Sequence, residues 1–316
     1  MEDHPPAKKA RTLREGESKG ILELTNGHAR DSRITFAEEG HIYYIDGVDY
    51  KAQGGIGSTT FIKGFFAEFD APRIIGYILR GRRYKSDSEY KYYRKTATEI
   101  KEMWRVNGQE ACDAGTKMHA TIEHFYNGQD IVNPSVELAQ FLEFEKSRLN
   151  LTPYRTEWMI FDHEFRICGA IDMVFRHPDG EVSIWDWKRS KNIKKTSSSK
   201  AHFPIEHLPD CNHVHYSLQQ NLYRYILEKN YGLKVKSMHL LVCHPNRVKY
   251  CDIPLRFMTS EIEDLLYYRK LALFKAGVIN LNELGITPEE AEQIDWDCVR
   301  VKADPQDAVV GKPGEA

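Results

Sequence analysis

The pattern of apolar and polar residues along the chain changes near residue 150. Residues 33–52 alternate apolar and polar side chains around Asp46-Gly47, a pair typical of tight turns, which predicts a β-hairpin. Three segments with apolar residues at helical spacing follow, at 59–69, 88–106 and 108–128. Ser58 is placed to cap the first helix, and Gly128 to end the third. We therefore expect the first half of the chain to be largely helical.

Strands are predicted after residue 150, where β-branched and aromatic residues become frequent. Residues 155–163, 166–177 and 181–188 are rich in them and are separated by turn signals, so we expect three antiparallel strands. A polar segment, 190–215, leads into an amphipathic helix that Gly232 ends. The pattern is completed by strands at 235–245 and 247–254 and a helix at 260–277.

The two ends of the chain lack apolar periodicity. We expect a disordered basic tail at 1–30, a hairpin and helical region at 31–110, a core at 111–300 and a second disordered tail at 301–316. The segment PAKKAR in the first tail resembles a nuclear import signal, although short basic clusters are also common in solvated tails. A nuclear location is one interpretation of it.

Composition narrows the class of protein. The longest apolar runs, such as MHLLVC, fall far short of the ~20 residues that span a bilayer, and the N-terminus lacks an apolar signal core. We expect a soluble intracellular protein with no membrane contact that is not secreted.

The 44 Lys and Arg nearly balance the 46 Asp and Glu, so any nucleic-acid surface must be a local patch. Six scattered cysteines without a CxxC pair argue against a zinc finger, an iron–sulfur cluster or a disulfide framework.

The segment GAIDMVFRHPDGEVSIWDWKRSK carries the candidate chemistry. Its turn signal is centred on Asp179, and symmetric pairing about that centre places Asp172 opposite Asp186. Two facing carboxylates repel unless a cation lies between them. Lys188 lies two residues beyond Asp186, hence on the same face of the strand. Oxygen ligands without thiolates favour Mg²⁺ or Mn²⁺ over zinc.

An alternative is an ordinary surface ion pair, worth about 0–1 kcal/mol. The neighbouring residues favour the functional interpretation, because apolar side chains on both faces predict a covered sheet, in which a charged cluster is costly. These are Ile171, Met173, Phe175, Trp185 and Trp187 on the far face, and Val174 and Ile184 beside the acids.

On these motifs the sequence resembles the PD-(D/E)XK nuclease superfamily, specifically its RecB-like exonuclease branch. GAID and WDWKRSK, at the right separation, resemble the second and third motifs of the family. The resemblance implies a restriction-endonuclease-like α/β core, with a central mixed β-sheet flanked by helices and a helical N-terminal region. It also implies metal-binding and catalytic roles for Asp172, Asp186 and Lys188.

Further family positions lie on the flanking elements. A lone helical His is more often a surface or core residue, yet Gly115, Thr116, His119 and Glu123 match the family's G-T-x-x-H-x-x-x-E helix in order. The resemblance makes His119 a metal ligand and places Thr116 and Glu123 near the substrate. Glu157 resembles an acidic catalytic position, with an ordinary strand carboxylate as the alternative.

Other residues are expected to contact the substrate. Gln219 and Tyr223 match the family's Q-x-x-x-Y helix, which is implied to contact DNA, although such tyrosines can merely pack in a core. The segment LRGRRYKSDSEYKYYRK mixes basic and aromatic residues, as expected where phosphates are neutralised and bases stack, and it could also be a solvated helix. KRSKNIKKTSSSK follows the catalytic strand. The binding candidates from these two segments are Arg82, Arg83, Tyr92, Arg189 and Lys191.

The resemblance implies a Mg²⁺- or Mn²⁺-dependent deoxyribonuclease, an exonuclease in DNA repair, recombination or replication, that hydrolyses phosphodiester bonds with a metal-activated water. Its partners would be DNA with single-stranded or free-end segments, and replication or recombination proteins. One alternative is a structure-specific or flap endonuclease. Another is an inactive nucleic-acid-binding module of the same fold, against which the intact set of His119, Asp172, Asp186 and Lys188 argues. No iron–sulfur cluster is expected, because the clustered C-terminal cysteines that it needs are absent.

Overall fold

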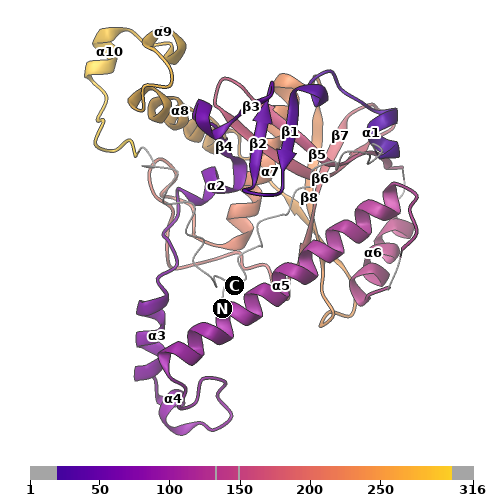
Figure 1. Cartoon of the computed structure of the whole chain (residues 1–316), viewed down its shortest axis with the longest axis vertical. Helices are drawn as coiled ribbons and strands as arrows, with labels where there is room; N and C mark the ends of the chain where they lie inside the picture. The colour runs from indigo at the N-terminus through magenta and orange to yellow at the C-terminus, as the bar shows by residue number, and fades with distance from the viewer. Residues whose placement is uncertain (1–19, 132–133, 149, 301–316) are drawn as a thin grey trace.

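A mixed six-stranded sheet forms the centre of the molecule (Figure 1). The computed structural model describes residues 20–131, 134–148 and 150–300. The strands run in the order β4-β6-β7-β8-β9, with β5 paired to the other edge of β6. The β7–β8 and β4–β6 pairs are parallel and the others antiparallel. The bounds are β4 Ile56–Gly57, β5 Thr152–Asp162, β6 Ile167–Arg176, β7 Val182–Arg189, β8 Val235–Cys243 and β9 Cys251–Leu255.

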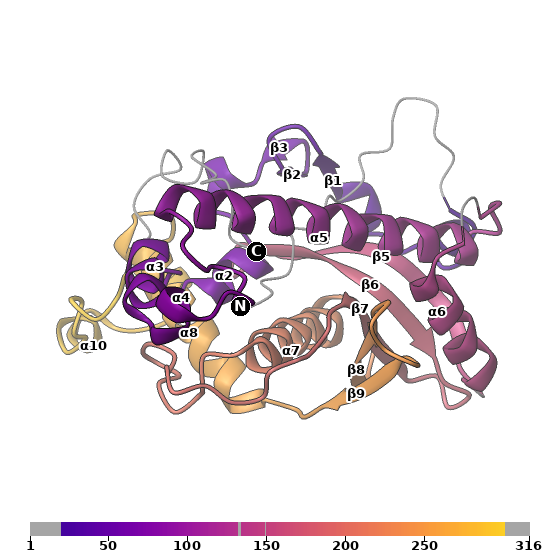
Figure 2. The same ribbon diagram turned by 90° about the horizontal axis from the view of Figure 1, so that it is seen from below.

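Helices cover both faces of this sheet (Figure 2). Helices α5 (Ala97–Tyr126) and α6 (Val136–Ser147) pack on one face, where Ile122, Phe141 and Trp187 share a buried cluster. On the other face lie α2 (Ser58–Lys63), α7 (Asn212–Asn230) and α8 (Thr259–Lys275), and their apolar side chains join those of the sheet in the largest cluster. The expectation of a sheet buried on both sides is confirmed, since every residue from 182 to 188 is buried.

Smaller elements surround the core. A three-stranded sheet of β1 (Ile34–Ala37), β2 (Ile42–Ile45) and β3 (Val48–Asp49) contains the expected hairpin at Asp46-Gly47, where both residues have positive φ. Helices α3 (Ala71–Arg80) and α4 (Arg82–Ser86) project away from the core beside the start of α5 (Figure 1). The remaining elements are α1 Ile21–Thr25, α9 Leu281–Leu284, α10 Pro288–Glu292 and two short 3₁₀ turns, Asp31–Arg33 and Lys51–Gln53.

The helical region differs from its prediction in several ways. The segments 88–106 and 108–128 were expected to form two helices, but α5 runs unbroken through Gly108 and begins only after Thr96, whose side chain forms a capping box with Glu99. Helix α5 is buried against other elements on both sides of Gly108, which offsets the ~1 kcal/mol cost of a helical glycine. Helix α2 ends at Lys63, before the expected residue 69, and α3, α4 and α6 were not predicted.

The expected first tail is wrong for residues 20–30. Residues 1–19, with the basic segment, and 301–316 lie outside the described residues. Asn26 donates a hydrogen bond to the Tyr154 carbonyl, and Arg30 to that of Phe161, so this segment is bound along β5. Within the part of the chain that the structure describes, no helix is both long and apolar enough to cross a membrane.

Candidate active site

The β6–β7 hairpin has the register that its turn predicts. Met173 pairs with Trp185 and Val174 with Ile184, which is symmetric about Asp179. The paired residues end there, so Asp172 and Asp186 lie one step beyond the ladder. Strand β5 pairs with one edge of β6 along its length, so β7 and β4 share the opposite edge. There β7 pairs with the end of β6, and the short strand β4 pairs with its start. The two acids therefore lie where β7 separates from β6.

Strand β5 is interrupted at the same level. Thr156 pairs with Met173 and Trp158 with Ile171, but Glu157 between them has a positive φ of 45° and pairs with no residue of β6. A non-glycine residue in this left-handed region is strained, and such residues cluster at functional sites. The alternation of side chains along β6 also differs from the prediction. Ile171, expected on the far face with Met173, belongs instead to the core cluster on the α7 side.

Three potential metal ligands converge on this opening. His119 of α5, Glu157 of β5 and Asp172 of β6 offer ligand atoms that all lie within 4.8 Å of one another. The His119 Nδ1 atom lies 3.5 Å from Glu157 Oε1 and 3.5 Å from Asp172 Oδ2. All three side chains are at least three-quarters buried, at 18%, 21% and 0% exposure. Helix α5 thus brings its imidazole across the sheet to two carboxylates.

Hydrogen bonds fix the orientation of these groups. The Nε2 atom of His119 lies 2.8 Å from the Trp187 carbonyl oxygen, which can only accept, so Nε2 carries the proton. The Nδ1 atom faces the carboxylates and is buried with no hydrogen-bond partner among the described residues. Asp172 Oδ2 accepts a hydrogen bond of 2.8 Å from the Trp187 amide. An oriented imidazole beside two carboxylates fits a divalent cation, with Trp187 as an outer partner of both ligands.

Asp186 lies outside this trio and is held from the α7 side. It is ion-paired with Lys188, which is 7% exposed, and Gln220 donates a hydrogen bond of 3.1 Å to its Oδ1. The Lys188 ammonium also lies 4.7 Å from the centre of the Tyr216 ring. Gln220 was not among the residues predicted from the sequence, because the family motif matches its neighbour, Gln219. The two side-chain amides differ in the face of α7 on which they lie. Gln220 is one turn beyond Tyr216, on the face toward β7.

The motif residues of α7 contact α2. Gln219 donates a hydrogen bond of 2.7 Å to Thr59, and the Tyr223 hydroxyl lies 2.8 Å from the Ser58 hydroxyl. Ser58 was expected to cap α2, but it is the first helical residue and its hydroxyl bonds to Tyr223. Tyr223 is 2% exposed, and burial raises the pKa of its phenol far above the ordinary value. In this structure its hydroxyl is a neutral group that joins two helices.

The remaining α5 and β7 candidates flank the site. Thr116 and Glu123 are half-buried on α5, one turn before and after His119. Arg189, directly after Lys188, donates a hydrogen bond of 2.6 Å to Glu137 of α6. Burial alone raises the pKa of Glu137, but bonds to its own backbone amide and to Arg189 lower it. Arg189 is therefore anchored as an ion pair, while Lys191 is exposed two residues further on.

Two of the candidates in the segment 82–92, Arg82 and Arg83, lie on α4, and Tyr92 lies in the turns between α4 and α5, apart from the trio. Arg82 and Arg83 are exposed, and Arg83 is ion-paired with Asp87. Tyr92 is only 4% exposed, and its hydroxyl accepts a hydrogen bond of 2.7 Å from the Trp104 indole. Its ring supports the packing of α3 against α5, so it presents no face on which a base could stack.

Among the comparisons with known proteins, a family model identifies the superfamily of this chain. The family model described as the PD-(D/E)XK nuclease superfamily matches residues 132–304. No curated protein matches. Among solved structures, that of SSO0001 is 16% identical and covers 72% of this chain and 77% of its own, with a TM-score of 0.28. A candidate exonuclease from Eubacterium rectale is 9% identical over 73% of this chain and 85% of its own, with a TM-score of 0.33.

Those TM-scores are too low for the two structures to support a conclusion, whereas the family model spans more than half of the chain. The matched range includes every acidic and basic site residue that lies beyond α5, namely Glu157, Asp172, Asp186 and Lys188. The matched α/β core with its mixed sheet is the one described above. This chain belongs to the PD-(D/E)XK nuclease superfamily.

Proposed function

We propose that this protein is a divalent-metal-dependent deoxyribonuclease of the RecB-like branch, and that it degrades DNA from a free end. The observation that carries the proposal is the convergence of His119, Glu157 and Asp172 beside the Lys188–Asp186 pair. Such a set combines a cation site with a buried ammonium group, as hydrolysis of a charged phosphodiester requires. His119 lies outside the residues that the family model matches, so it supports the proposal independently.

Each protein group has a separate task. His119, Glu157 and Asp172 would hold Mg²⁺ or Mn²⁺, which when bound supplies a Lewis acid for the phosphoryl oxygen. Lys188 orients the attacking water and stabilises the negative charge that develops on the phosphate, which is most effective for a buried ammonium. Asp186, also a metal ligand expected from the sequence, fixes that ammonium, and Gln220 fixes Asp186. We assign substrate contacts to Gln219, Thr116, Glu123, Arg189 and Lys191, whereas the buried Tyr223, also expected to contact DNA, holds α7 against α2.

The substitution Lys188→Ala tests the central role. We expect DNA cleavage to fall by at least about 100-fold, because a preorganised charge at the transition state is lost, while DNA binding survives. Cleavage of labelled DNA and binding in EDTA measure the two properties separately. Lys234→Ala is the matched control, because its exposed side chain precedes β8, beside the opposite end of β7 from Lys188. Wild-type cleavage by Lys188→Ala would refute the proposal.

The requirement for a free end needs its own experiment. Linear end-labelled DNA and covalently closed circular DNA are incubated with the protein in Mg²⁺, Mn²⁺ or EDTA. Degradation of the linear form alone is the expected result. Nicking of the circles would instead favour the structure-specific or flap endonuclease, and binding without cleavage under any metal would favour an inactive binding module.

A further inference from the structure

The projecting lobe, residues 71–95 with α3 and α4, has a hydrophobic cluster of its own. Ile75 and Tyr92 pack there against Ile100 and Trp104 of α5. Trp104 and His119 lie on the same helix, about 22 Å apart along its axis at 1.5 Å per residue, so the lobe that packs on Trp104 is fixed relative to the metal ligands. Figure 1 shows this single helix running from the lobe to the central sheet.

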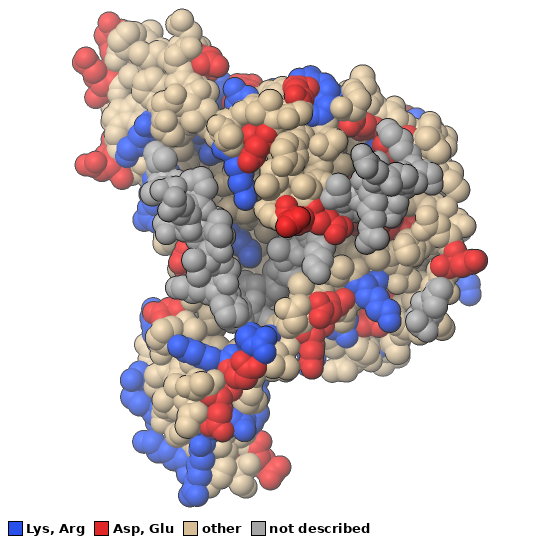
Figure 3. Space-filling model, in the orientation of Figure 1, with Lys and Arg blue, Asp and Glu red and all other residues tan. Residues whose placement is uncertain are grey.

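The lobe is strongly basic in an otherwise balanced chain. Between 71 and 95 there are eight Lys and Arg but only two acids, whereas the whole chain has 44 and 46. Figure 3 shows Lys and Arg side chains gathered around this projection. A cationic surface of this kind attracts the phosphates of nucleic acids. Its exposed basic residues are Arg73, Arg80, Arg82, Arg83, Lys85, Lys91 and Arg94.

An exposed aromatic ring lies among these charges. Arg73, Tyr77 and Arg80 share one face of α3, because they are four and three residues apart. The Tyr77 side chain is 59% exposed, and the two guanidinium carbons lie 5.9 and 5.3 Å from the centre of its ring. A ring flanked by cations can stack on a base while the cations bind the flanking phosphates. In duplex DNA the bases are already stacked, so this combination fits a single strand.

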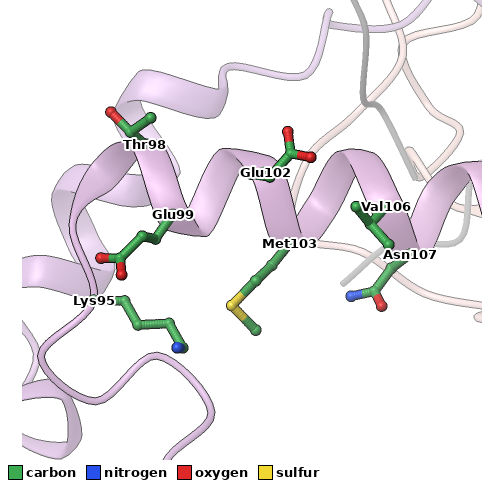
Figure 4. A pocket seen from close by; sticks show the side chains of 7 residues that line it. All are labelled: Lys95, Thr98, Glu99, Glu102, Met103, Val106 and Asn107. Atoms are coloured by element: carbon green, nitrogen blue, oxygen red, sulfur yellow. The ribbon is translucent and has the colours of Figure 1, made fainter.

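A hollow at the start of α5 fits a single nucleic-acid strand less well. It measures about 510 Å³ and is lined by Lys95 and by residues of the start of α5 (Figure 4). Its wall carries two carboxylates, Glu99 and Glu102, against the single cation Lys95, so it lacks the excess of positive charge that phosphates require. We therefore assign the binding of a single nucleic-acid strand to the surface of α3 and α4.

We propose that the lobe binds a single nucleic-acid strand, with one base stacked on Tyr77 and phosphates on Arg73 and Arg80. The lobe then holds the substrate at a fixed distance from the cutting site. This inference rests on the proposed function for the identity of the substrate, but it concerns a separate surface.

Binding in EDTA tests the surface without cleavage. Full-length protein is titrated into a labelled single-stranded 20-nucleotide DNA and into its duplex. We expect Tyr77→Ala to weaken binding of the long single strand about 5- to 100-fold, the loss typical of one stacked base, without affecting the duplex. Arg73→Glu with Arg80→Glu should reduce the slope of log affinity against log salt by about 1.4.

Matched controls are Tyr267→Ala, a half-exposed tyrosine of α8, and Lys234→Glu, an exposed lysine before β8. Equal binding of the long single strand by Tyr77→Ala and wild type would overturn the proposal, as would equal losses for the single strand and the duplex. Preferential binding of anionic lipid vesicles or an acidic peptide would also overturn it. If wild type binds through Tyr77 yet never cleaves DNA, the nuclease proposal fails and the lobe assignment stands.

Discussion

At the scale of single residues, the two adjacent glutamines of α7 should have separable effects. Gln220 touches Asp186 and is 1% exposed, so Gln220→Leu should lower kcat about 10- to 100-fold, as the loss of a supporting hydrogen bond at a metal site typically does. Gln219 contacts Thr59, and Gln219→Leu should mainly raise KM. Steady-state cleavage of both variants measures this difference. An unchanged kcat for Gln220→Leu would contradict the positioning role.

The imidazole in the trio should set the metal preference. Nitrogen ligands suit transition metals better than Mg²⁺, which prefers oxygen. We therefore expect Mn²⁺ to bind more tightly than Mg²⁺, and His119→Ala to weaken Mn²⁺ at least about 10-fold while affecting Mg²⁺ less. Calorimetric titration of the protein without DNA measures both affinities. His124→Ala, on the same helix, serves as the control, and equal losses for the two metals would count against His119 as a ligand.

At the scale of elements, one glycine decides how closely α2 and α7 approach the sheet. A Cβ at Gly169 would lie 2.6 Å from the Ser58 hydroxyl and 2.7 Å from the Tyr223 ring. Gly169→Ala should therefore destabilise the protein by about 1–3 kcal/mol, the usual cost of overpacking. Gly57→Ala is the control, because its Cβ would meet no atom within 4 Å and its φ is −70°. Denaturant unfolding measures both, and equal stabilities would show that the contact relaxes freely.

Helix α5 shows what local sequence could not predict at this scale. A glycine at 108 and polar neighbours suggested two helices, yet one helix joins the lobe to His119. Contacts on either side of the glycine, to α3 at one end and to the sheet at the other, outweigh its weak propensity. Those contacts come from residues far apart in the chain, so no window of local sequence contains them.

At the scale of the whole molecule, the metal should contribute to stability. Folding brings the Glu157 and Asp172 carboxylates together, and their repulsion can amount to a few kcal/mol, on the order of 3 at an effective dielectric constant of 20. Metal at 100 times its Kd should add about 2.7 kcal/mol to the free energy of unfolding of the wild type. Asp172→Asn removes one charge, so its unfolding should depend much less on metal and the variant should be no less stable in EDTA. Thermal unfolding with Mg²⁺, Mn²⁺ and EDTA measures this, and identical metal shifts in the two proteins would argue against the site.

The sequence by itself determined the hairpin and its register. A turn signal at 178–180 is local, and it is sufficient to set the pairing of Met173 with Trp185 and of Val174 with Ile184, directly beside Asp172 and Asp186. The order of strands and helices after residue 150 is equally local, because each element has its own periodicity and stop signals. The family motifs also led to His119 and Glu157 as candidates.

The tertiary structure alone decided how these residues meet. The left-handed backbone at Glu157, the separation of β7 from β6 and the bond from His119 to Trp187 bring together residues from three elements, and none of these features has a local sequence signal. The choice of Gln220 over Gln219 depends on the rotation of α7 about its axis, which packing against the sheet sets. Local periodicity fixes elements, whereas the position of one element against another is fixed by long-range burial and hydrogen bonding.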